Sequence, residues 1–321
     1  MFEKVNPGHP DKMADRLAGA VVDLVYERAG GLTKARSAHS DACLSKNPRV
    51  ACEVMAGHGR VDVQIETSLG RMDLRAEDID PLIRRLFGER VVGNVLIAPQ
   101  DAHLSENQSR GLRCGDNGIF RGCPPTEEQR VLTAIAATIY GSIPYDGKYI
   151  IHTKSNDLHG NPIWKATICQ SHASQRQIED IIDQWVERGN IGDSMLVTNI
   201  NPLGPWTGGI DVDCGCTNRK LGSDMGDGVT GGGLMGKDLS KADVSVNIVC
   251  YLKAVASGQT VTAMCSIGDE SVTFVYHDGR RETETFADIV EMARLYILTD
   301  CGGSFERFAE WGLIRPRIYK D

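Results

Sequence analysis

The stretch GPWTGGIDVDCGCTNRKLGSDMGDGVTGGGLMGKDLSKAD, residues 204–243, is the segment around which the rest of the chain is interpreted. It holds eleven of the 35 glycines, six aspartates and the basic residues Arg219, Lys220, Lys237 and Lys241. Glycine lets backbone N–H groups approach an anion closely, Lys and Arg supply charged donors, and Asp can hold the magnesium that accompanies nucleotide phosphates. The composition favours a polyphosphate-binding segment. A mobile glycine-rich surface loop is the plainer alternative.

A helix is predicted directly after this stretch, over the apolar run Val244–Ala256. Lys237 and the turn Gly231–Gly233 come just before its N-terminus. The start of a helix attracts anions because its free N–H groups and its dipole both favour negative charge. This arrangement favours phosphate binding over a plain loop.

The composition is that of an ordinary globular protein. The chain has 321 residues, 41% of them hydrophobic, which is enough for a sizeable core and allows two or three domains. Its net charge of −8 argues against a nucleic-acid partner, so a bound anion must be met by local basic clusters. No apolar run reaches the ~18 residues of a membrane span, and the first residues lack the apolar region of a signal peptide. We therefore expect a cytoplasmic protein without a membrane partner.

The ten cysteines are expected to be reduced thiols, many of them small core residues. The closest pair is Cys214 and Cys216, a C-x-C without a second C-x-x-C or histidines at zinc spacing. The sequence therefore does not favour a structural zinc site.

Hydrophobic periodicity predicts both helices and strands. The predicted helices are 11–28, 77–87, 126–140, 175–188, 244–256 and 287–296. The predicted strands are 50–54, 60–68, 91–98 (as a buried strand), 148–154, 163–170, 261–266 and 271–276. Because strand pairs followed by a helix recur about three times, we expect an α+β fold of three related two-layer units. The expected domains are 1–120, 121–203 and 204–321.

Two local features bear on function. Glu53 lies inside an apolar strand, where a carboxylate is either a partly exposed edge residue or, if buried, needs a cation or donors. The polar stretch 100–114 is long for a loop in a compact domain, and such loops often act as lids over a site.

Several motifs together resemble one family, the S-adenosylmethionine synthetases (methionine adenosyltransferases). Their order and spacing across residues 8 to 243 make the combination specific, although several motifs are weak individually. The matching pieces are Gly8-His9-Pro10-Asp11-Lys12, Val50-Ala51-Cys52-Glu53, Gly115-Asp116-Asn117-Gly118, Asp146-Gly147-Lys148, Asn201-Pro202, Asp213-Cys214-Gly215, Thr217-Asn218-Arg219-Lys220, Gly231-Gly232-Gly233 and Gly236-Lys237-Asp238-Leu239-Ser240-Lys241-Ala242-Asp243. The resemblance is faint beyond residue 256, and the chain is shorter than typical members, which implies a trimmed or diverged form.

The resemblance implies a transferase with a pseudo-threefold α+β fold that makes S-adenosylmethionine from ATP and L-methionine. In the family the methionine sulfur attacks ribose C5′ and displaces tripolyphosphate, which is then hydrolysed to pyrophosphate and phosphate. The implied catalytic residues are His9, Lys148, Lys237, Lys241 and Arg219. The implied substrate-binding residues are Glu66, Gln100, Asp116, Asp213, Lys220 and Trp206. Asp11 and Asp243 would hold two Mg²⁺ ions and Glu53 a K⁺ ion, in a homodimer or tetramer with sites between subunits.

Each of these residues also has a plainer interpretation on its own. His9 can be a helix cap, Asp11 a first-turn acid, Lys148 a solvated turn lysine and Trp206 a core residue. Only the joint pattern favours the site.

The chain also departs from the family pattern. Pro7 stands where the family has Glu, Gln100-Asp101-Ala102-His103 replaces Gln-Ser-Pro-Asp, and Gly204-Pro205-Trp206 replaces Gly-Arg-Phe. We expect altered loop gating and altered tolerance of nucleotides or methionine analogues. Two other functions remain open: hydrolysis of ATP or tripolyphosphate without alkyl transfer, and a non-catalytic nucleotide-binding regulatory homologue.

Overall fold

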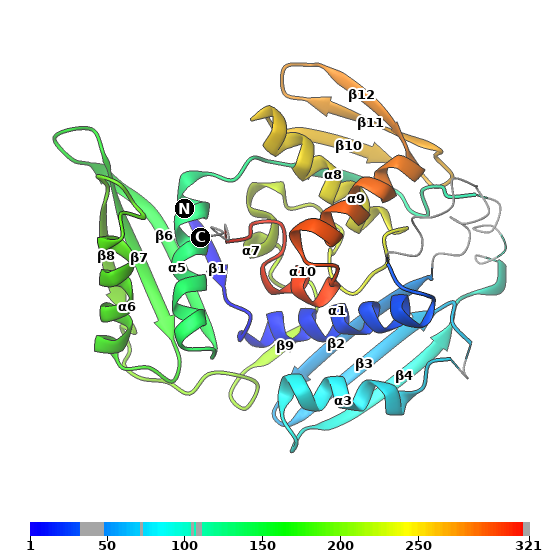
Figure 1. Ribbon diagram of the computed structural model, residues 1–321, viewed down its shortest axis with the longest axis horizontal. Coiled ribbons are helices and arrows are strands. Elements are labelled where there is room, and N and C mark those ends of the chain that lie inside the picture. The colour runs from blue at the N-terminus through cyan, green and yellow to red at the C-terminus, as the bar shows by residue number, and fades with distance from the viewer. Residues whose placement is uncertain (33–47, 71–72, 104–105, 107–110, 317–321) are drawn as a thin grey trace.

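The computed structural model describes residues 1–32, 48–70, 73–103, 106 and 111–316. Within these residues the chain forms three four-stranded sheets, each packed against helices (Figure 1). The α+β class and its organisation into several sheet-and-helix layers are confirmed.

The first sheet has the order β4-β3-β2-β9. Its strands are β2 (Val50–Gly57), β3 (Arg60–Thr67), β4 (Val92–Pro99) and β9 (Cys214–Cys216). β2 and β3 are an antiparallel hairpin, and β4 runs parallel to β3 after the crossover helix α3 (Ala76–Phe87). Alternate residues of β2 and β3 are buried, while the other face of the sheet is open. The long helix α1 (Pro10–Arg28) packs on the buried face and against β9.

The second sheet has the order β1-β6-β7-β8 and lies at the left of Figure 1. Its strands are β1 (Phe2–Val5), β6 (Gly147–Asn156), β7 (Pro162–Gln170) and β8 (Met195–Ile200). The helices α5 (Glu127–Ser142) and α6 (Gln175–Glu187) belong to this unit. A capping box starts α5: the side chains of Thr126 and Gln129 each accept a hydrogen bond from the backbone N–H of the other residue.

The third sheet has the order β12-β11-β10-β5. Its strands are β5 (Gly118–Gly122), β10 (Val261–Cys265), β11 (Ser271–Tyr276) and β12 (Arg281–Thr285). The helices α8 (Ala242–Ser257) and α9 (Phe286–Asp300) pack on it, and α10 (Phe305–Trp311) lies against α1. A short helix α7 (Leu221–Met225) and the 3-10 turn η2 (Gly226–Gly228) interrupt the glycine-rich stretch.

Each sheet takes one strand from a distant part of the chain. β1 joins the sheet of β6–β8, β5 joins that of β10–β12, and β9 joins that of β2–β4. The predicted domain boundaries at 120/121 and 203/204 stay a prediction, and the sheets themselves cross them.

All thirteen predicted helices and strands correspond to elements of the fold, with ends shifted by a few residues. The prediction of a buried strand over 91–98 is wrong about burial, because Val92 and Leu96 on β4 are 67% and 58% exposed. The elements that were not predicted are β1, β5, β8, β9, β12, α7, η2 and α10. Residues 104, 105 and 107–110 of the predicted lid lie outside the described residues.

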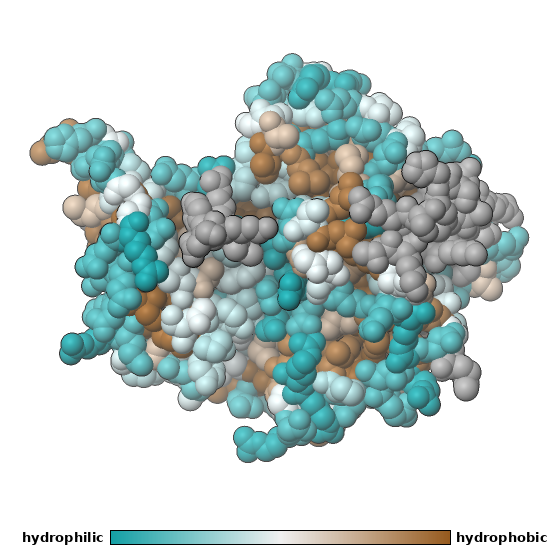
Figure 2. Space-filling view, viewed as in Figure 1, coloured by the Kyte–Doolittle hydropathy of each residue, from teal (hydrophilic) through white to brown (hydrophobic). Residues whose placement is uncertain are grey.

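Two hydrophobic cores stabilise the units. The larger core joins α1 to α8, α9 and the first and third sheets, and the smaller core joins the second sheet to α5 and α6. Figure 2 shows hydrophobic residues around α8, α9 and α10, with hydrophilic residues over the tip of the third sheet. None of the described helices is both long and apolar enough to cross a membrane. All nine cysteines in the described part of the chain are free thiols.

Candidate active site

His9 caps the N-terminus of α1, as its plainer interpretation predicted. Its Nδ1 accepts a hydrogen bond from the Asp11 N–H at 3.1 Å, and Pro10 fills the first helical position, where no N–H is needed. A histidine ring that accepts at Nδ1 carries its proton on Nε2. His9 therefore offers one N–H donor.

Burial keeps the His9 ring neutral. The side chain is 3% exposed, and burial, followed by repulsion from Lys148, Lys220 and other nearby cations, lowers the pKa of His9 to about 3. A neutral imidazole surrounded by cations can still donate a hydrogen bond, through its one N–H, to a negative charge that develops during a reaction.

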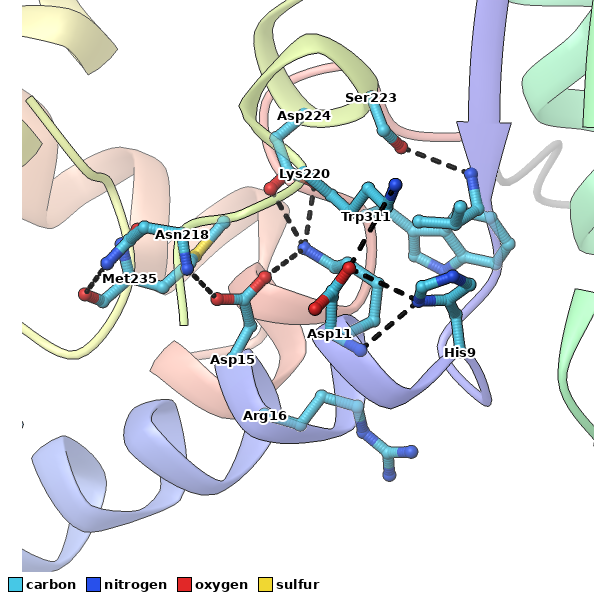
Figure 3. A network of polar contacts seen from close by, with 12 residues as sticks. His9, Asp11, Asp15, Arg16, Asn218, Lys220, Ser223, Asp224, Met235 and Trp311 are labelled. Carbon is cyan, nitrogen blue, oxygen red and sulfur yellow. Dashed lines mark hydrogen bonds and ion pairs between the residues drawn. The ribbon is translucent and has the colours of Figure 1, made fainter. Parts of the chain in front are cut away.

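Asp11 connects the start of α1 to the glycine-rich stretch (Figure 3). Its Oδ1 accepts from the Cys216 N–H at 2.9 Å and lies 3.3 Å from Arg219 Nε, while Oδ2 lies 3.9 Å from Lys220 Nζ. Strand β9 can approach this closely because Gly215 has no side chain: a Cβ there would lie 2.1 Å from the Pro10 carbonyl oxygen. Two predicted phosphate-binding cations and one predicted metal ligand therefore meet at one point.

A cavity of about 370 Å³ opens beside His9. It lies between the second sheet and the loop that follows β8. Its lining comprises His9, Asp146, Lys148, Cys169, Asn201, Pro202, Leu203, Gly204, Pro205, Trp206 and Asp213. Four residues that were predicted from the sequence, His9, Lys148, Trp206 and Asp213, share this cavity. Its size is within the range of small-molecule sites.

Lys148 and Trp206 form two walls of the cavity. Lys148 pairs with Cys169 across β6 and β7, so both side chains stand on the open face of the second sheet. Trp206 is half-buried, and its indole N–H donates to Asn201 Oδ1 at 3.4 Å. The core alternative for Trp206 is therefore not what the structure shows: the indole lines the cavity as a flat apolar surface.

Asp146 is a site residue for which the sequence analysis predicted no role. It is 4% exposed; Oδ2 accepts from the Gly209 N–H at 2.8 Å, and Oδ1 has no hydrogen-bond partner in the described chain. Burial raises the pKa of Asp146 to about 6, while the bond from Gly209 and the Lys148 charge act in the opposite direction. A buried polar atom without a partner is costly. Asp146 therefore offers an acceptor to a donor group in the cavity.

The turn before α8 carries the remaining predicted cations. Lys237 Nζ contacts Asp243 Oδ2 at 2.7 Å, and Lys241 is the N-cap residue of α8. The expected position of this turn directly before a helix N-terminus is confirmed.

The other predicted residues lie on different elements. Glu53 is exposed on β2, where it accepts a hydrogen bond from the Thr217 hydroxyl. Glu66 is exposed on β3, Gln100 follows β4 and Asp116 precedes β5. None of these four lines the cavity in the described part of the protein. Their predicted roles stay predictions.

The carboxylates can be tested against the predicted metal ions. No group of three or more His, Cys, Asp or Glu side chains that could hold a metal occurs in the ranges that the structure describes. Mg²⁺ is often held by one or two carboxylates together with substrate phosphates. Asp11 contacts Arg219 and Lys220, and Asp243 contacts Lys237, so these carboxylates fit ions that arrive with a nucleotide rather than a cage built from protein alone.

A larger cavity of about 800 Å³ lies elsewhere, among α8, α9, α10 and the segment Leu313–Pro316. It contains none of the predicted site residues. The site is therefore identified by the chemistry of its lining and not by cavity size.

The three sheet-and-helix units and the cavity beside His9 define an α+β protein with a polar pocket of small-molecule size. No family model matches the chain. It is 29% identical to the S-adenosylmethionine synthase of Jannaschia sp. (strain CCS1), over 91% of this chain and 83% of that relative. It is 28% identical to the S-adenosylmethionine synthase of Sulfurovum sp. (strain NBC37-1), over 76% and 69%.

A solved structure of an unusual S-adenosylmethionine synthetase from Campylobacter jejuni has a similar fold, with a TM-score of 0.63 and 17% identity. The likeness covers 99% of this chain and 91% of that one. The predicted resemblance is therefore confirmed: most of the chain is similar to curated S-adenosylmethionine synthases, at 28–29% identity.

Proposed function

We propose that the protein is a methionine adenosyltransferase that makes S-adenosylmethionine from ATP and L-methionine. The observation that carries the proposal is the junction at Asp11. Asp11 contacts the cations Arg219 and Lys220, and its Oδ2 lies 3.8 Å from Nδ1 of His9, which lines the cavity together with Trp206 and Asp146. A nucleoside joined to a polyphosphate needs such a cavity next to such cations.

His9 and Lys148 stand where the two parts of the ligand would join. The reaction forms a bond from the methionine sulfur to ribose C5′ and breaks the bond from C5′ to the tripolyphosphate oxygen. Negative charge grows on that oxygen as the bond breaks. The neutral His9 N–H and the Lys148 ammonium would stabilise this charge from fixed positions, which is commonly the largest catalytic effect available to a protein.

The phosphate chain would extend from this point toward the glycine-rich stretch. Arg219, Lys220, Lys237 and Lys241 would neutralise it, since guanidinium and ammonium groups are strong donors to phosphate oxygens. Tripolyphosphate hydrolysis at the same place would add water to a P–O bond and give pyrophosphate and phosphate.

Mg²⁺ would be held by Asp11 and Asp243 and would supply neutralising charge to the phosphate oxygens when bound. Glu53, beside the Thr217 hydroxyl, would hold K⁺. The contacts of Asp11 to Arg219 and of Asp243 to Lys237 keep these carboxylates oriented toward the phosphate region.

The direct test is a reaction of the purified protein with ATP, methionine, Mg²⁺ and K⁺, with S-adenosylmethionine measured by mass spectrometry. Formation of the sulfonium product supports the transferase. Phosphate release without it, at the same rate with and without methionine, supports the hydrolase alternative. ATP binding without turnover supports the regulatory homologue.

We expect Asp146 to make ATP use pH-dependent. Its free oxygen would accept hydrogen bonds from ribose hydroxyls, and it does so best when ionised. Because the folded-state pKa is about 6, protonation below that pH should lower kcat/KM for ATP. Asp146→Asn should lower kcat/KM roughly 10-fold or more at neutral pH and remove the acid limb.

The matched substrate for this prediction is 2′,3′-dideoxy-ATP, which lacks the proposed donors. The wild type should use this analogue with a low kcat/KM, and Asp146→Asn should not lower that kcat/KM further. An acid limb that persists in Asp146→Asn would mean that another group titrates.

We propose that two copies pair through the open face of the first sheet. This face exposes Met55, Val92 and Leu96, at 57%, 67% and 58%, beside the predicted site residues Glu53 and Glu66. Exposed apolar clusters rimmed by polar groups commonly mark protein interfaces. Pairing there would bring Glu53 and Glu66 of one copy toward a site of the other.

Leu96→Asp is therefore expected to convert a dimer to a monomer and to abolish most transfer activity. Sedimentation equilibrium measures the mass, and the same samples are assayed. Ile119→Asp, on the similarly exposed face of the third sheet, is the control and should leave the dimer intact. A wild-type monomer with full activity would contradict the proposed pairing.

A further inference from the structure

Four charged side chains without solvent exposure meet behind the candidate active site: Lys4, Lys12, Asp15 and Asp224. Lys12 Nζ donates to Asp15 Oδ2 at 3.1 Å and to the two oxygens of Asp224 at 2.8 and 3.0 Å. Figure 3 shows Asp15 and Asp224 converging on this amino group from α1 and from α7. Buried charges persist only when they are paired. The cluster therefore fixes the carboxylate of Asp15 in one place.

The second oxygen of Asp15 points at the glycine-rich stretch. Asp15 Oδ1 accepts from the Asn218 N–H at 2.8 Å. Asn218 has a left-handed backbone, with φ of 61°, a conformation that Asn tolerates better than most other non-glycine residues. Asp15 is one of the groups that hold it.

Asn218 in turn connects the two halves of the stretch. Its Oδ1 accepts from the Met235 N–H at 2.8 Å, and its Nδ2 donates to the Met235 carbonyl at 3.2 Å. The contact is close because Gly233 has no side chain: a Cβ there would lie 2.3 Å from Asn218 Cγ. Arg219 and Lys220 directly follow Asn218, and Lys237 follows Met235 by two residues.

We infer that Asp15 is a positioning residue for the polyphosphate site: locked by Lys12, it holds Asn218, and through Asn218 it fixes Arg219, Lys220 and Lys237. The inference rests on the proposed function. Asp15 would contact no substrate. Its effect is geometric, and small displacements of positioned groups can cost two orders of magnitude in rate.

The test is a double-mutant cycle between Asp15 and Arg219, read out by titration calorimetry with Mg²⁺-tripolyphosphate and by kcat for transfer. Arg219→Ala alone should weaken tripolyphosphate binding roughly 10-fold. In an Asp15→Ala background the arginine is already displaced, so adding Arg219→Ala should weaken tripolyphosphate binding by less than about 2-fold. Asp15→Asn keeps an oxygen acceptor for the Asn218 N–H and should stay within about 3-fold of the wild type.

Asp23→Ala is the matched structural control. Asp23 lies on the same helix and accepts from Ser304 Oγ, Phe305 N and Glu306 N, so its loss weakens the attachment of α10 and leaves the bond between Asp15 and Asn218 in place. Arg219→Ala should keep its full effect in the Asp23→Ala background. If Asp15→Ala does not fold, Asn218→Gly replaces it: the left-handed backbone is kept, the two bonds to Met235 are lost, and the cycle is run with Lys237→Ala.

The inference would be overturned if Asp15→Ala and Arg219→Ala weakened tripolyphosphate binding independently, so that the loss in the double variant equalled the product of the two single losses. It would also be overturned if Asp15→Asn lost as much affinity as Asp15→Ala, because the charge and not the hydrogen bond would then matter. Equal tripolyphosphate binding by the wild type and Arg219→Ala is a separate result. It would remove the phosphate site itself, and with it both the proposed function and this inference.

Discussion

Lys148→Met is expected to lower kcat for S-adenosylmethionine formation about 10²- to 10³-fold while the dissociation constant for ATP changes less than about 3-fold. Lys148 lines the cavity beside His9, and no ion-pair partner of its ammonium occurs in the described chain. Such a cation is available to stabilise charge that appears only as the C5′–O bond breaks. Interactions that strengthen only in the transition state affect kcat and not ground-state binding.

The measurement combines single-turnover kinetics with equilibrium binding of ATP. Lys165→Met is the control, because Lys165 is an exposed lysine on the adjacent strand β7 that does not line the cavity. If Lys148→Met weakens ATP binding and kcat/KM equally and leaves kcat unchanged, the lysine serves only to hold phosphate. An unchanged rate in both measurements would remove Lys148 from the site.

Lys12→Met is expected to have the largest effect on stability, a loss of about 3–5 kcal/mol. The substitution leaves Asp15 and Asp224 fully buried without their shared cation. Breaking a buried ion pair by removing one partner is far more costly than losing a surface pair, because an uncompensated charge stays in the interior. Urea unfolding of both proteins at neutral pH measures the difference.

This loss should depend on pH in a defined direction. Burial raises the pKa of Asp15 from 3.8 to about 7, so at about pH 5 its carboxyl is already protonated in the folded wild type and needs no cation. The penalty of Lys12→Met should therefore be smaller near pH 5 than near pH 8. Arg60→Met, which breaks the exposed pair with Asp62, should change stability little at either pH. A loss of similar size in both variants would show that the buried cluster is not special.

The helices and most strands could be predicted from the sequence because their signals are local. The apolar period of 11–28 lies within a single helix, and the capping pair Thr126 and Gln129 lies at the start of another. The strands β1, β5 and β9 could not be predicted in the same way. They are short, β9 being only Cys214–Cys216, and they form because distant segments present a free sheet edge.

The burial of β4 was predicted wrongly for a physical reason. Its apolar run favours a strand that is covered on both faces, yet in a single copy one face is open, with Leu96 and Val92 exposed. The same exposed apolar face supports the proposed pairing of two copies, because a second copy would cover it.

The site was partly predictable. The motifs indicated His9, Lys148, Asp213 and Trp206, which the fold brings to one cavity. Asp146 lies in one of the same motifs, but its free buried oxygen is visible only in three dimensions. The positioning of Asn218 by Asp15 joins residues 203 positions apart, and no local pattern reports such a contact.

A single-turnover reaction with excess enzyme over ATP, with methionine, Mg²⁺ and K⁺ present, tests the central claim most directly. S-adenosylmethionine, pyrophosphate and phosphate should appear in equal amounts from each ATP consumed. ADP and phosphate as the products, with methionine left unchanged, would contradict the transferase and would identify the cavity beside His9 as the site of an ordinary ATP hydrolase.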